Sequence, residues 1–123
     1  MNTIETLFVP YELAVKLKEL GFDEPCLASY FHAGKMLDVC EYITHGKYTV
    51  LAPTFSQSFR FFREKYEIYY TIEGSKKFGF QHFIYDEKGS YEIKSEEIFK
   101  NYEEAELACL TKLISIVEQQ KQK

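Results

Sequence analysis

The residues most able to do chemistry in this sequence are its three histidines and three cysteines. Four of them follow one another in a single stretch, with the spacing Cys26-x5-His32-x7-Cys40-x4-His45. Structural zinc sites bring their ligands in close pairs such as C-x2-C, because one turn can then direct both at the same ion. The stretch holds no such pair, so we interpret the cysteines as free thiols and predict no metal.

No other motif predicts a reaction. The glycine-rich loops that hold phosphates, GxGxxG and GxxxxGKS or GxxxxGKT, do not occur. Adjacent carboxylates such as Glu103 and Glu104 lie at a predicted helix start, where the helix dipole explains them better than acid–base catalysis does. We assign no catalytic residue and no cofactor. An unrecognised enzyme stays an open alternative, since active sites assemble from residues that are remote in sequence.

Aromatic side chains are unusually common, with 10 Tyr and 11 Phe making up 17% of the chain. One function they suggest is stacking of single-stranded nucleic acid on an aromatic sheet. Against it, the net charge is −4, and nucleic acid is held mainly by neutralising its phosphates. The rings of such a platform would be Tyr69, Tyr70, Phe78, Phe80, His82 and Tyr85, near the cations Arg60, Arg63, Lys76 and Lys77.

The function we favour is a non-catalytic protein-interaction module, with a homodimer as one form of it. Tyrosine is enriched in the centres of protein interfaces, where a half-exposed ring supplies contact area and its hydroxyl finds a partner. An uncovered edge strand can also pair with its symmetry mate. The predicted contact residues are Tyr69, Tyr70, Phe80 and Tyr85.

Apolar periodicity predicts three helices that would carry or support such a surface. The first begins with Pro10 at its first helical position and stops at Gly21. The second covers residues 54–66, and the third runs over residues 102–121 with Asn101 as its N-cap and a wide apolar face. The second helix carries one aromatic stripe that we assign to the core, namely Phe55, Phe59, Phe62 and Tyr66.

Alternating β-formers predict the strands. One hairpin joins residues 26–32 and 37–43, a second joins 67–73 and 77–86, and residues 91–95 form a further strand. We therefore predict an α+β fold in which three helices pack on an antiparallel sheet of about four to six strands.

Chain length predicts one globular domain over residues 1–123, with the first few residues and about 118–123 frayed. Within it, Pro10 and Pro53 each open a helix that a hairpin follows. Two similar α-β-β units, with a closing strand and helix, account for the whole chain.

The start of the chain lacks the basic and apolar regions of a signal peptide, and no apolar run approaches the roughly 20 residues of a membrane span. Three widely spaced cysteines, an odd number, fit a reducing compartment. We predict a cytoplasmic protein with no membrane partner and little affinity for nucleic acid.

Three segments together, residues 8–26, 59–69 and 101–117, carry a resemblance. They resemble an uncharacterised family of small proteins that is widespread in phages and mobile elements of gut Bacteroides-type bacteria. The match covers about half the chain. The resemblance implies no known activity, cofactor or catalytic residue, only the setting of a phage or mobile-element accessory protein, many of which act by binding.

Overall fold

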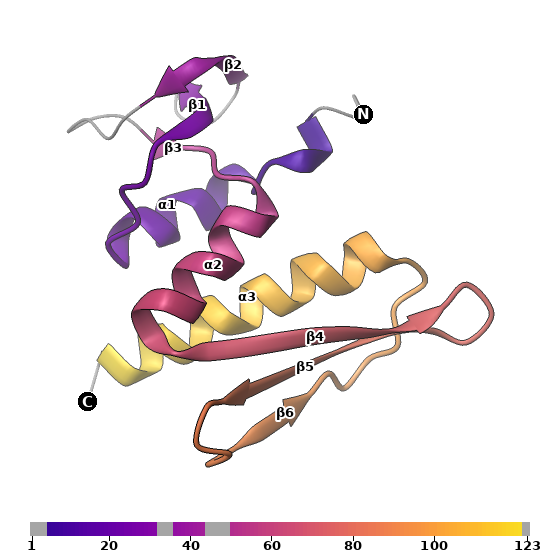
Figure 1. The fold of residues 1–123 in the computed structure, drawn as a ribbon. Coiled ribbons are helices and arrows are strands. Elements are labelled where there is room, and N and C mark those ends of the chain that lie inside the picture. Colours follow the sequence, from indigo (N-terminus) through magenta and orange to yellow (C-terminus); the bar gives the residue numbers. More distant parts are fainter. Residues whose placement is uncertain (1–4, 32–35, 44–49, 122–123) are drawn as a thin grey trace. The chain divides into compact units, whose positions relative to one another are not determined.

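The structure is a computed structural model that describes residues 5–31, 36–43 and 50–121 (Figure 1). The chain divides into two compact units, Met1–Ser58 and Phe59–Lys123, with the boundary inside one helix. Each unit contains an antiparallel sheet of three strands. The α+β class is confirmed, with the difference that the strands form two sheets rather than a single one. The single domain expected over residues 1–123 stays a prediction.

The first unit places a short sheet beside helix α1, and its β1–β2 hairpin confirms the first predicted hairpin. The strand order is β2-β1-β3. Its elements are the 3-10 turn η1 (Glu5–Leu7), α1 (Tyr11–Glu19), β1 (Cys26–Phe31), β2 (Met36–Ile43) and β3 (Val50–Leu51).

Both ends of α1 follow from single residues. Pro10 is the N-cap rather than the first helical residue, so the helix begins one residue later than predicted. The carbonyl of Pro10 accepts hydrogen bonds from the amides of Leu13 and Ala14. Gly21 has a φ of 100°, which a residue with a side chain rarely adopts, and this confirms the predicted stop. The amide of Phe22 then donates to the carbonyl of Leu17 at 2.9 Å, so the chain turns back onto the helix.

Helix α2 (Phe55–Tyr66) begins with a capping box. The amide of Gln57 donates to Thr54 Oγ1 at 3.2 Å, and the amide of Thr54 donates to Gln57 Oε1 at 3.1 Å. Of the predicted aromatic stripe on this helix, Phe59 and Phe62 are buried, and Phe55 and Tyr66 are half-buried.

The second unit consists of a three-stranded meander and the long C-terminal helix. Its strand order is β4-β5-β6, which confirms the second hairpin and the further strand. Its elements are β4 (Ile68–Ser75), β5 (Gly79–Asp86), β6 (Glu92–Lys94) and α3 (Tyr102–Lys121). Helix α3 begins as predicted, with Asn101 Oδ1 accepting from the amide of Glu104 at 2.8 Å. Fraying beyond residue 118 stays a prediction.

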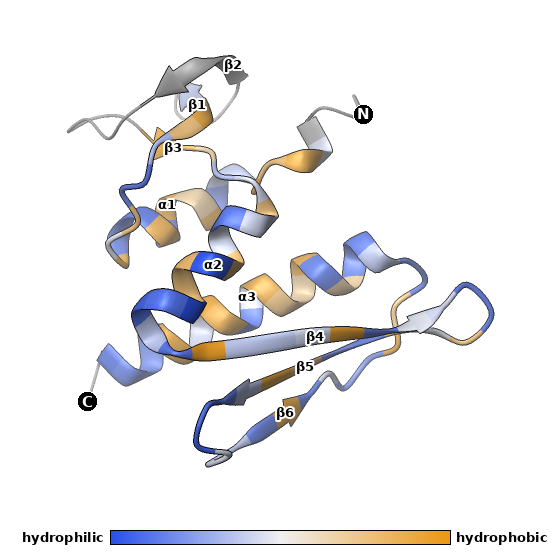
Figure 2. Ribbon diagram, viewed as in Figure 1, coloured by the Kyte–Doolittle hydropathy of each residue, from blue (hydrophilic) through white to orange (hydrophobic). Residues whose placement is uncertain are grey.

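Helix α3 packs against one face of the β4-β5-β6 sheet (Figure 1). In Figure 2 hydrophobic residues recur along α3, β4 and β5, whereas the turns between the strands are hydrophilic. On the middle strand, Ile84 and His82 are buried and mark the face that the helix covers. The buried side chains of α3 are Ala105, Cys109, Leu110, Leu113, Ile114 and Val117.

Replacing Leu113 by Asp is expected to unfold the protein. Leu113 is 1% exposed, and a buried carboxylate without a partner costs several kcal/mol, on the order of the whole stability of a small domain. Thr111→Asp, at an exposed position of the same helix, is the matched control and should shift the melting temperature by only a few degrees. A cooperative melt of Leu113→Asp close to that of the control would show that this face of α3 is not core.

Candidate functional site

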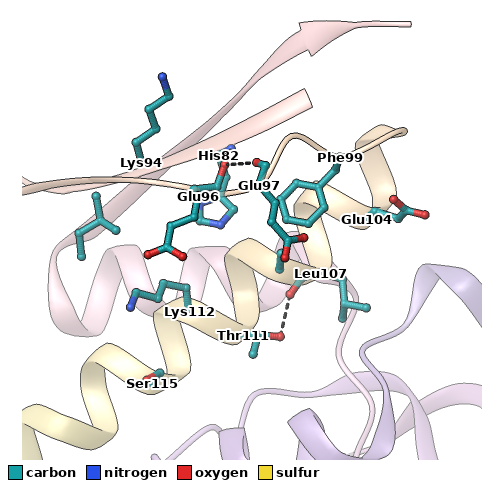
Figure 3. Close-up of a pocket in the computed structure, with 13 residues that line it drawn as sticks. His82, Lys94, Glu96, Glu97, Phe99, Glu104, Leu107, Thr111, Lys112 and Ser115 are labelled. Atoms are coloured by element: carbon teal, nitrogen blue, oxygen red, sulfur yellow. Dashed lines mark hydrogen bonds between the residues drawn. The ribbon is translucent and has the colours of Figure 1, made fainter. Parts of the chain in front are cut away.

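A groove opens between helix α3 and the edge of the β4-β5-β6 sheet (Figure 3). Its volume is about 840 Å³, which lies in the range of small-molecule sites. Its wall is mixed and contains apolar side chains and side chains of both signs of charge. The lining comprises His82, Ile93, Lys94, Ser95, Glu96, Glu97, Phe99, Glu104, Leu107, Ala108, Thr111, Lys112 and Ser115.

A bulge in the strand next to β5 forms one side of this groove. Phe83 of β5 pairs with Lys94, and Phe80 of β5 pairs with Phe99. Two residues lie between the paired positions on β5, but four lie between them on the opposite segment, so that segment contains two additional residues. Residues 95–98 therefore depart from regular pairing. Bulges of this kind bend a strand and redirect its side chains.

Ser95 closes the bulge through its side chain. The amide of His82 donates to Ser95 Oγ at 3.1 Å, and Ser95 Oγ donates to the carbonyl of Glu97 at 3.0 Å. The amide of Ser95 donates in turn to the carbonyl of His82 at 2.9 Å. A hydroxyl thus serves as both acceptor and donor where the regular ladder is interrupted, and it holds the backbone of His82 in place.

The imidazole of His82 lies at the base of the groove and is 5% exposed. Its ring stacks on Phe99, with centroids 6.3 Å apart and an angle of 17° between the planes. Its Nδ1 is buried and has no hydrogen-bond partner among the described residues. A buried polar atom left unpaired costs about 1–3 kcal/mol, so this atom calls for a physical explanation.

Burial lowers the pKa of His82, and the positive charge of Lys112 lowers that pKa further. The imidazole is therefore neutral at pH 7, and it can donate one hydrogen bond and accept one. Lys112 comes from α3, across the groove from the strand that carries His82. Helix and sheet together place a cation close to a neutral imidazole.

A second polar cluster lies between β4 and the first turns of α3. The ring of Tyr70 stacks on that of Phe59, with centroids 3.9 Å apart. Burial raises the pKa of the Tyr70 phenol, and the nearby Tyr102 raises it further. Burial also raises the pKa of Glu106, with Glu103 adding to the shift. These groups share the helix side of the sheet, where they fill space beside the core.

The opposite face of the same sheet carries aromatic side chains that neither α2 nor α3 covers within the described part of Phe59–Lys123. Tyr69 and Tyr85 are directly opposite each other in the ladder, and their rings stack at 5.9 Å. Thr71 and Phe83 form the next pair on this face. Tyr69, Phe83 and Tyr85 are half-buried and Thr71 is exposed. We call these four residues the open face.

The four predicted contact residues therefore divide between the two faces. Tyr69 and Tyr85 belong to the open face, whereas Tyr70 and Phe80 lie on the helix side. Phe80 packs edge-on against Tyr102 at 6.1 Å. The alternation of a strand shows which residues share a face, but not which of the two faces is core.

The aromatic residues proposed for nucleic-acid stacking are separated in the same way. Tyr70, Phe80 and His82 lie under the helices, and Phe78 is 75% exposed in the β4–β5 turn with Lys77 Nζ 5.2 Å from its ring. Only two of the six suggested rings thus share the open face.

The metal spacing suggested by the sequence is described only at Cys26, because His32, His45 and the side chain of Cys40 lie outside the described residues. Cys26 is buried, and its Sγ donates to the carbonyl of Glu24 at 3.3 Å. Burial raises the pKa of Cys26 and of Cys109 to about 12, so both thiols are protonated and poor nucleophiles at neutral pH. Within the described ranges, no three His, Cys, Asp or Glu side chains gather as metal ligands would.

No protein-family model, curated protein or solved structure matches the chain. Among the described residues, none of the helices has the length and apolar character needed to cross a membrane. The function of the groove and of the open face is therefore inferred from their side chains alone.

His82 is recognisable in the sequence as a candidate, but the residues that act around it are not. In the sequence, Ser95 looks like an ordinary polar residue of a turn, and Lys112 looks like an ordinary charged residue on a helix surface. A signal was present in the short strand ending at Lys94, because the residues after it no longer alternate. The register shift that gives Ser95 its role depends on pairing with a strand more than ten residues away.

The pH dependence of stability tests the state of His82. Because its pKa is lower in the folded than in the unfolded chain, the unfolded state binds more protons as the pH falls below about 6.5. Stability should therefore be flat above pH 7.5 and decline towards pH 5, by at most about 1.4 kcal/mol per pH unit for this one group. His82→Gln should lack this part of the decline. Parallel melting-temperature profiles of the two proteins between pH 7.5 and 5 would refute the assignment.

Proposed function

We propose that this chain is a non-catalytic protein-interaction module that binds a protein partner, in the simplest case a second copy of itself, through the open face. The observation that carries the proposal is the stacked pair of Tyr69 and Tyr85, set beside Phe83 on the side of the sheet opposite α3. Tyrosines placed in this way offer rigid contact area with little side-chain entropy to lose.

The surroundings of these rings support the proposal. In register with the open face, Glu73 and Gln81 lie beyond Thr71 and Phe83, and Glu92 and Lys94 lie on β6 opposite Tyr85 and Phe83. An aromatic centre with a polar and charged rim is the usual composition of a protein interface. The rim holds two carboxylates and one ammonium, which disfavours a phosphate backbone.

The biological setting belongs to the same proposal. A cytoplasmic location is supported by the widely spaced cysteines, two of which are buried thiols. The role of phage or mobile-element accessory protein rests on the resemblance of three segments alone.

Removing the two rings of the open face should weaken self-association. In size-exclusion chromatography with light scattering, Tyr69→Ser/Tyr85→Ser should dissociate at a concentration where the native protein is dimeric. Truncating a central interface tyrosine costs about 2 kcal/mol or more, so the dissociation constant should rise at least ~30-fold. Phe78→Ser is the matched control, since it removes a more exposed aromatic ring away from this face.

If the native protein is monomeric, the proposal requires a different protein as the partner of the open face. A benzophenone side chain placed at Thr71 should then cross-link a protein in host cells, whereas one placed at Gln119, an exposed position of α3 outside the groove lining, should not. Equal yields from the two positions would argue against the proposal. So would micromolar, salt-resistant binding of short single-stranded DNA or RNA that is lost in Tyr69→Ser/Tyr85→Ser, which would favour base stacking on the same rings.

A further inference from the structure

The groove beside His82 has features that a protein contact through the open face does not use. His82 is more than nine-tenths buried, lines the groove, and carries an Nδ1 without a hydrogen-bond partner among the described residues. The bulge at residues 95–98 and the helix together keep a space of about 840 Å³ next to it. A buried, unpaired nitrogen at the base of such a space is the arrangement that a ligand group completes.

Charges of opposite sign lie at the two ends of the helix wall. Glu104, Ala108 and Lys112 all line the groove and are spaced by four residues, so they form one stripe along α3. A helix rises about 1.5 Å per residue, which puts the backbone positions of Glu104 and Lys112 about 12 Å apart along the axis. Ala108 between them leaves room for a ligand, because its side chain is a single methyl group.

Apolar surface lies alongside this stripe. Leu107 is 38% exposed although it belongs to the apolar pattern of α3, and it lines the groove together with Phe99 and Ile93. Figure 3 shows Leu107 and Phe99 near Glu104, with Lys112 further along the helix. A ligand for this site therefore combines an apolar body with a negative and a positive end.

We propose that the groove binds a short peptide of two or three residues with free termini and apolar side chains. The carboxylate lies at the Lys112 and His82 end, where one of its oxygens accepts a hydrogen bond from the imidazole. The ammonium lies at the Glu104 end. An extended peptide of this size spans about 7–11 Å, and the flexible side chains of Lys112 and Glu104 cover the remaining distance.

The bulge adds two further carboxylates to the groove, Glu96 and Glu97. Together with Glu104 they outnumber Lys112, since the side chain of Lys94 points away from the groove (Figure 3), and this disfavours a simple anion as the ligand and favours one that also carries an ammonium. The neutral state of His82 fits the same ligand, since a neutral imidazole can give a hydrogen bond to a carboxylate without adding a second cation.

The probe is leucyl-leucine, compared with N-acetyl-leucyl-leucine, which lacks the ammonium, and with leucyl-leucinamide, which lacks the carboxylate. Binding is measured at pH 7.5 by calorimetry and by the NMR shifts of the His82 imidazole. Leucyl-leucine should move the His82 resonances, and each blocked form should bind about tenfold more weakly, as expected when one charged contact is lost.

Two variants assign the ends of the peptide. Lys112→Met should abolish the preference for the free carboxylate, and Glu104→Gln should abolish the preference for the free ammonium. Lys121→Met, an exposed lysine of α3 outside the groove lining, should change neither. Tyr69→Ser/Tyr85→Ser should bind the peptide normally, so failure of the open-face proposal is distinguishable from failure of this one.

Three results would overturn the inference. They are no shift of His82 with any of the three compounds at millimolar concentration, equal affinity for all three, and a preference for free ends that survives in both Lys112→Met and Glu104→Gln. Glu104, Lys112 and Lys121 are exposed and Tyr69 and Tyr85 are half-buried, and the melting temperature of each variant shows whether the fold is kept.

Discussion

The second unit depends on the burial of helix α3 against one face of a three-stranded sheet. Ile84 of the middle strand is fully buried, and the buried residues of α3 extend over more than three turns, from Ala105 to Val117. Burying apolar surface contributes about 25 cal/mol per Å², so this contact stabilises the unit. A sheet of three strands with helices on only one side has a second face, and that face must be polar or contact something else. Here its middle is aromatic.

The same packing also explains the groove. The strand next to β5 contains two extra residues, so it cannot follow β5 regularly down to Phe80 and bulges beside α3. Ser95 compensates by offering its hydroxyl to the amide of His82. The result is a neutral, buried imidazole between a helix and a bulge, with its pKa lowered by burial and by Lys112. One irregularity of the edge strand therefore produces both the space and the unpaired polar atom in it.

The sequence was sufficient for what local patterns determine. Capping by Asn101, the stop at Gly21 and both hairpins are consequences of residues close together in the chain, and all four were predicted correctly. Which strands share a sheet is not local. The two-residue strand β3 pairs with β1 across 20 to 22 residues of sequence, and the division into two sheets was missed for this reason. The same limit applied to the contact surface, because Tyr69 and Tyr70 are neighbours of the same type and only the position of α3 separates them.

The central claim is that the open face of the β4-β5-β6 sheet is where this protein meets its partner. Hydroxyl-radical footprinting measures the exposure of each aromatic ring. It is applied to the dilute protein and then to the protein at high concentration, or in the presence of a partner that cross-linking has identified. We predict that labelling of Tyr69, Phe83 and Tyr85 falls on association, while labelling of Phe78 in the β4–β5 turn stays constant. Association that leaves these three rings fully labelled, or that protects Phe78 instead, would contradict the account.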